Sequence, residues 1–101
     1  MPREVAVSDF RTTKDGRLEV KAGAESWRKV TSSTDPAELR SMASAFDAAY
    51  EGATLPSGYR ITPRGRFEKA VDEYSWRFLS YMSDRDRFPA FAAELRARAN
   101  C

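Results

Sequence analysis

The chain has almost no means of being held together by covalent or metal cross-links. Its 101 residues include no histidine and a single cysteine, the terminal Cys101. Histidine-bearing zinc sites and four-thiolate zinc or iron–sulfur sites are therefore excluded. The fold must come from a hydrophobic core, and 42% hydrophobic residues are enough for one domain of this size. We predict a single domain over residues 1–101, with no metal and no cofactor.

The first third of the chain has the alternation typical of β-strands. Leu18 and Val20 alternate with charged residues, which is the period-2 pattern of a half-buried strand. Asp15-Gly16 precedes them and suits a tight hairpin turn, because glycine adopts positive φ at little cost. We predict a β-rich segment over residues 1–31, with an antiparallel hairpin at this turn. A third short strand would carry Trp27 in the core.

Three helices are predicted in the remainder. Residues 35–51 begin with Asp35-Pro36, a capping residue followed by proline at the first helical position. Residues 62–83 begin in the same way with Thr62-Pro63, and then carry an apolar stripe at helical spacing. That stripe includes Phe67, Val71, Tyr74 and Phe78.

The third predicted helix covers residues 88–99, and Asp84 and Asp86 are expected to cap it. No internal repeat is expected. The predicted fold is a small α+β domain, in which an N-terminal antiparallel hairpin or three-stranded sheet packs on two or three helices.

The chemistry open to this chain is narrow. Without histidine, imidazole acid–base catalysis and Ser-His or Cys-His nucleophile pairs are excluded. Asp84 and Asp86 are not followed by the glycine and glutamate of a calcium loop. The 17 basic and 15 acidic residues leave a net charge of +2, which argues against a strongly basic nucleic-acid module. We therefore predict that the protein is not an enzyme and holds no metal.

Two features indicate a binding surface. Arg60, Arg64 and Arg66 cluster at the predicted start of the second helix, where backbone donors favour an anion. The alternative is an exposed connector whose arginines pair with Glu68 or Asp72. Trp76 lies on the polar side of that helix, where it either packs beneath another element or anchors a partner. The predicted partner-binding residues are Trp76, Arg60, Arg64, Arg66 and Arg77.

These features favour a small non-enzymatic binding or regulatory protein that docks on another macromolecule, such as a bacterial or phage accessory or inhibitor protein. The alternative is a nucleic-acid-associated protein that uses its arginines, with Arg85 and Arg87 added to those above. A protein partner is expected, nucleic acid is the second possibility, and a homodimer stays open. The N-terminus lacks the apolar stretch of a signal peptide and no run could cross a membrane, so a cytoplasmic protein without membrane contact is predicted.

Overall fold

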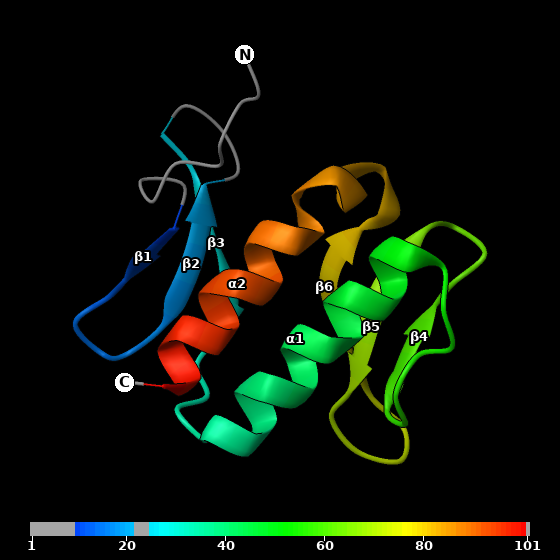
Figure 1. Ribbon diagram of the computed structural model, residues 1–101, viewed down its shortest axis with the longest axis horizontal. Coiled ribbons are helices and arrows are strands. Elements are labelled where there is room, and N and C mark those ends of the chain that lie inside the picture. Colours follow the sequence, from blue (N-terminus) through cyan, green and yellow to red (C-terminus); the bar gives the residue numbers. More distant parts are fainter. Residues whose placement is uncertain (1–9, 22–24, 101) are drawn as a thin grey trace.

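The computed structural model describes residues 10–21 and 25–100, and it contains two three-stranded sheets and two α-helices (Figure 1). The elements in order are β1 (Phe10–Thr12), β2 (Leu18–Lys21), β3 (Trp27–Thr31), α1 (Pro36–Glu51), β4 (Tyr59–Ile61), β5 (Arg66–Ala70), β6 (Trp76–Tyr81), the 3-10 helix η2 (Met82–Arg87) and α2 (Phe88–Ala99). Both sheets are antiparallel, in the orders β1-β2-β3 and β4-β5-β6. The α+β prediction is confirmed, and neither helix in the described ranges is long and apolar enough to cross a membrane.

The N-terminal hairpin turns where the sequence predicts. The Gly16 N–H donates to the Thr13 carbonyl at 3.0 Å, and Gly16 has φ 87°. Leu18 and Val20 face the core, as expected. The predicted β-rich segment before Phe10 lies outside the described residues.

Replacing Gly16 by alanine should lower the free energy of unfolding by about 1 kcal/mol. The nearest atom to an added Cβ is Nη2 of Arg98 at 4.0 Å, so the cost comes from the left-handed backbone and not from a clash. Chemical denaturation measures it. Lys14→Ala, at an exposed position of the same turn, is the control and should change stability little. Equal denaturation midpoints for the two variants would contradict a left-handed backbone conformation at Gly16.

The helices predicted over residues 35–51 and 88–99 are confirmed as α1 and α2. Asp35 caps α1 by accepting from the Ala37 N–H at 3.1 Å, and Gly52 ends it at φ 72°. The start of α2 differs from the prediction, because no side chain caps it. Asp84 and Asp86 instead lie within η2.

The helix predicted over residues 62–83 is wrong. Its place is taken by the hairpin of β5 and β6 together with the first residues of η2. Thr62-Pro63 opens a turn, in which the Gly65 N–H donates to the Thr62 carbonyl at 2.9 Å. Proline suits the second position of such a turn as well as the first position of a helix, because both require φ near −65°. The supposed apolar stripe is split, since Phe67 is buried whereas Val71 and Tyr74 are exposed.

The expectation of no internal repeat is also wrong. The order of three strands followed by a helix occurs twice, and residue n of the first unit (residues 10–51) corresponds to residue n + 49 of the second unit (residues 59–99). Both sheets have the same register, with a shift between Leu18 and Glu19 in one and between Phe67 and Glu68 in the other. Eight identical pairs lie in the strands and turns: Arg11 and Arg60, Thr13 and Thr62, Gly16 and Gly65, Arg17 and Arg66, Glu19 and Glu68, Ser26 and Ser75, Trp27 and Trp76, and Arg28 and Arg77.

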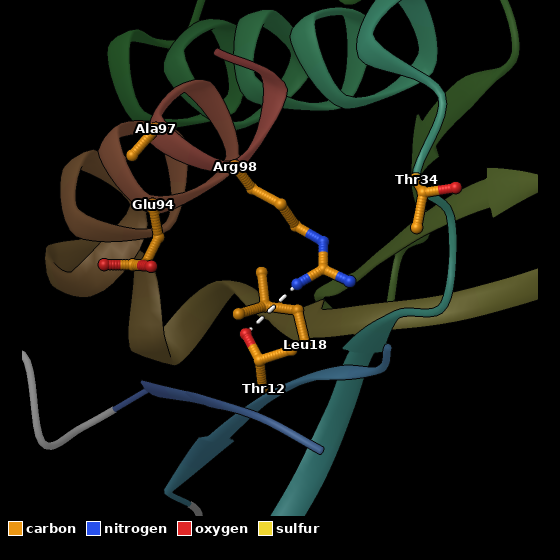
Figure 2. Close-up of a pocket in the computed structure, with 6 residues that line it drawn as sticks. All are labelled: Thr12, Leu18, Thr34, Glu94, Ala97 and Arg98. Atoms are coloured by element: carbon orange, nitrogen blue, oxygen red, sulfur yellow. Dashed lines mark hydrogen bonds between the residues drawn. The ribbon is translucent and has the colours of Figure 1, made fainter. Parts of the chain in front are cut away.

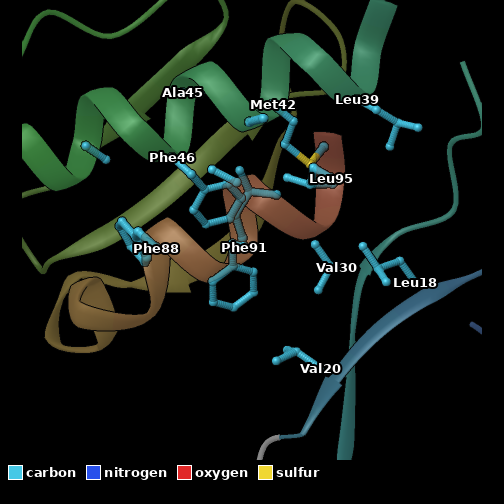
Figure 3. Close-up of a cluster of buried hydrophobic side chains, with 14 of the residues drawn as sticks. Leu18, Val20, Val30, Leu39, Met42, Ala45, Phe46, Phe88, Phe91 and Leu95 are labelled. Carbon is cyan, nitrogen blue, oxygen red and sulfur yellow. The ribbon is translucent and has the colours of Figure 1, made fainter. Parts of the chain in front are cut away.

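The two units share one core (Figure 3), and each helix contacts the sheet of the other unit. Phe46 on α1 packs against Phe67 on β5 with ring centroids 5.0 Å apart. Phe91 on α2 packs edge-on against Phe10 on β1 at 5.4 Å. Figure 1 shows the same arrangement, with α1 beside the second sheet and α2 beside the first. The units are therefore interlocked.

Candidate functional site

Each sheet has one face turned toward the helices and an outer face turned away from them. On the first sheet, Arg11 pairs across strands with Glu19, and Glu19 pairs with Lys29. These three side chains alternate with the buried Phe10 and Val20, so they lie on the outer face. On the second sheet the equivalent positions are Arg60, Glu68 and Phe78.

The outer face of the second sheet carries a compact cluster of Arg60, Arg66, Glu68 and Trp76. Arg60 and Arg66 form ion pairs with Glu68 at 2.8 and 3.1 Å. The Arg60 guanidinium lies over the Trp76 ring, 4.0 Å from its centroid. The carboxylate and the indole together fix the plane of this arginine.

The same cluster is present on the first sheet, built from Arg11, Arg17, Glu19 and Trp27. Arg11 and Arg17 lie 2.8 and 3.7 Å from the Glu19 carboxylate. Arg11 covers the Trp27 ring at 4.3 Å. We call the two sets the Arg–Glu–Trp clusters. Their agreement shows that the sequence repeat preserves a surface arrangement as well as the fold.

In each cluster the acid is covered and the arginines remain accessible. The side chains of Glu19 and Glu68 are only 10% and 8% exposed, whereas those of Arg11 and Arg60 are 48% and 45% exposed. Hydrogen bonds from Arg66 and then Arg60 hold the pKa of Glu68 below its usual value, so this acid is ionised at neutral pH. Each guanidinium has five N–H donors in a rigid plane. The carboxylate thus orients arginines that keep donors for a ligand.

The two sheets meet through a reciprocal pair of arginines. Arg28 of β3 donates to the Leu79 carbonyl of β6, and Arg77 of β6 donates to the Val30 carbonyl of β3 at 2.7 Å. Both donors and both acceptors are equivalent positions of the repeat. Nearby, the positive charge of Arg77, followed by burial and Arg17, lowers the pKa of Lys29. Arg77 is therefore close enough to Lys29 for its positive charge to disfavour the charged form of the lysine.

Charge divides between the layers of the molecule. The sheet segments, residues 10–21, 25–31 and 59–81, carry eleven basic and six acidic residues. The helical segments, residues 35–51 and 82–99, carry five basic and seven acidic residues. The net charge of the whole chain is small because a basic sheet layer and a slightly acidic helical layer partly cancel.

The structure brings three of the five predicted partner-binding residues together: Trp76, Arg60 and Arg66. They meet on a sheet and not at a helix start. The alternative prediction, in which these arginines pair with Glu68 or Asp72, is confirmed for the pairing of Arg60 and Arg66 with Glu68. Arg64 lies exposed in the turn between β4 and β5, and Arg77 lies in the junction with β3.

The first Arg–Glu–Trp cluster was missed by the sequence prediction. Trp27 was expected in the core, yet it is only partly buried beneath Arg11. Two short patterns could have revealed the cluster. Ser-Trp-Arg occurs at residues 26–28 and 75–77, and Gly-Arg-x-Glu occurs at residues 16–19 and 65–68.

The tip of the β5–β6 hairpin is a separate surface feature. Asp72 accepts from the Tyr74 and Ser75 N–H groups at 2.8 and 2.9 Å, which shapes the turn. Tyr74 is 90% exposed at this tip, and Val71 is exposed beside it. The first unit has Glu25 at the position equivalent to Tyr74, so the exposed tyrosine has no counterpart in its sequence.

A pocket of about 450 Å³ lies between α2 and the first hairpin (Figure 2). Its polar centre is Arg98, which donates to Thr12 Oγ1 at 3.2 Å and to the Gly16 carbonyl. The guanidinium thus ties α2 to the hairpin. In the second unit the buried Phe67 replaces Leu18, a wall of this pocket. One wall of the pocket therefore differs in side-chain size between the two units.

Comparison of the chain with protein-family models, with curated proteins and with solved structures gives no match. The function must be argued from the two clusters themselves.

Proposed function

We propose that the protein binds nucleic acid through the outer faces of its two sheets. The observation that carries this proposal is the presence of the same Arg–Glu–Trp cluster twice on the basic layer of the molecule. A single surface ion pair contributes little to stability. Two matching sets of oriented, accessible arginines are better explained by a ligand with repeated negative charge.

The chemistry of the clusters suits such a ligand. Arginine donates two parallel hydrogen bonds to phosphate oxygens or to the edge of a guanine. The exposed plane of a guanidinium that already lies on tryptophan can also stack on a base. Arg60 over Trp76 and Arg11 over Trp27 have this arrangement.

Fluorescence anisotropy with labelled 20-nucleotide duplex DNA, single-stranded DNA and RNA tests the proposal. Affinity should fall by at least about 100-fold between 50 and 200 mM salt if four or more phosphates are neutralised. Arg60→Gln should flatten the plot of log affinity against log salt by about one unit. Arg40→Gln is the matched control, because Arg40 is exposed on α1 in the acidic layer. It should leave binding unchanged. Absence of binding to all three probes at 50 mM salt would overturn the proposal.

A second candidate function is docking on a protein, which the sequence favoured. The observation that supports it is the exposed apolar tip formed by Val71 and Tyr74. Tyrosine is a common interface anchor because it buries a large, rigid surface. If the tip is the docking site, Tyr74→Ser should abolish partner binding without changing the melting temperature, and salt should affect affinity little.

A further inference from the structure

We infer that the two Arg–Glu–Trp clusters act together on one DNA duplex, placed symmetrically about the local two-fold axis of the double helix. This inference rests on the proposed function and names its ligand. It would make the chain a single-polypeptide counterpart of a two-fold-symmetric DNA-binding dimer.

The first support is the pseudo-two-fold symmetry of the contacts between the units. Arg28 reaches the Leu79 carbonyl while the equivalent Arg77 reaches the equivalent Val30 carbonyl. On the helical side, Asp47 and Arg96 also occupy equivalent positions, and they pair with each other at 2.7 Å. Contacts between equivalent positions arise where a two-fold axis passes between the units. The axis therefore runs from the junction of β3 and β6 to that of α1 and α2.

The second support is that this axis relates the two clusters. The equivalent residues Arg11 and Arg60 lie on opposite sides of the β3–β6 junction. Arg11 is on β1 and Arg60 is on β4, and each of these strands is the edge strand of its sheet that is farther from the junction. The antiparallel strands of a DNA duplex are related by the same kind of axis, so a two-fold protein contacts both strands in the same way. A single strand has no such axis, and could use both clusters only in different orientations.

The dimensions set the length of the site. The molecule measures 34 × 33 × 24 Å. Adjacent strands lie about 4.8 Å apart, so the two sheets side by side span about 30 Å. The clusters are then closer together than the roughly 34 Å that separates successive turns of one groove. Both clusters thus fit within about one turn, or about 10 base pairs, with the two half-sites adjoining each other.

Groove geometry favours DNA over duplex RNA. The major groove of B-DNA is about 12 Å wide and admits no more than a two-stranded β-ribbon, so a face of two three-stranded sheets lies over the groove and enters it only with its side chains. The major groove of A-form RNA is deep and narrow, and side chains cannot reach into it. Arg60 and Arg11 project from broad sheets and not from slender loops, so they reach base edges only in a groove that is wide enough for side chains to enter.

Titration of the whole protein with mixed-sequence DNA duplexes of 6, 8, 10, 12 and 16 base pairs tests the inference. Affinity should rise with length up to about 10–12 base pairs and then change little, with one protein bound per 12-base-pair duplex. Arg11→Gln and Arg60→Gln should each flatten the salt dependence by about one unit on that duplex, and the double variant by about two. Arg40→Gln again serves as the control. Should either variant fail to fold, Arg17→Gln and Arg66→Gln form a second equivalent pair.

Three results would overturn the inference while leaving nucleic-acid binding intact. The first is that substitution in one of the two clusters leaves the salt dependence of duplex binding unchanged. The second is a stoichiometry in which one protein binds two duplexes. The third is that single-stranded DNA or duplex RNA of equal length binds with the same affinity as the DNA duplex. Absence of binding to every nucleic acid would instead remove the proposed function as well.

Discussion

Phe46→Ala should lower the free energy of unfolding by about 3–5 kcal/mol. Phe46 is fully buried, and its ring lies 4.8–5.0 Å from those of Phe67, Phe88 and Phe91. Removing it opens a cavity where α1, α2 and the second sheet meet, so the surrounding groups cannot collapse without moving several elements. A loss of this size approaches the whole stability of a small domain. Urea denaturation followed by circular dichroism measures it.

Ser44→Ala is the control for this prediction, because Ser44 is exposed on the same helix. Its effect should stay within about 0.5 kcal/mol. A loss below about 1 kcal/mol in Phe46→Ala would show that the units do not share the core described above.

Neither half of the chain should fold alone as a monomer. A peptide of residues 1–54 contains the residues of α1 but lacks both aromatic partners from the second unit. Phe46 would lose its contact with Phe67, and Phe10 would lose its contact with Phe91. Chains of about 50 residues without disulfides or metals bury too little surface to tolerate such losses. Circular dichroism of residues 1–54 and of residues 55–101 should show little helix. Mixing the two peptides in equal amounts should restore it.

Charge should also direct which halves pair. In the intact chain Asp47 pairs with Arg96 at an equivalent position. Two copies of the first half would instead bring Asp47 against Asp47, and two copies of the second would oppose Arg96 with Arg96. The mixed pair is therefore favoured over either homodimer. A monomeric half with a cooperative melting transition would contradict the interlocked fold.

Short turn and cap motifs in the sequence predicted the structure correctly where each motif is compatible with only one backbone conformation. Asp15-Gly16 needs a left-handed residue, and Asp35-Pro36 combines a cap with a residue of suitable φ, so the first hairpin and α1 were predictable. Thr62-Pro63 satisfies a turn and a helix start equally well. The prediction failed there because the spacing of Phe67 and Tyr74 also fits a helix.

The repeat is present in the sequence itself, since Gly-Arg-x-Glu and Ser-Trp-Arg each occur twice at the same spacing, but it was recognised only once the two sheets showed the same register. The sequence did determine that no internal disulfide and no histidine-bearing metal site holds the fold together. The tertiary structure decided that each helix also packs against the sheet of the other unit, that Glu19 and Glu68 lie beneath their arginines, and that Arg28 and Arg77 join the sheets. Turns and caps depend on a few adjacent residues, whereas the Arg28 and Arg77 contacts join residues 51 and 47 positions apart and arise only when the two units pack together.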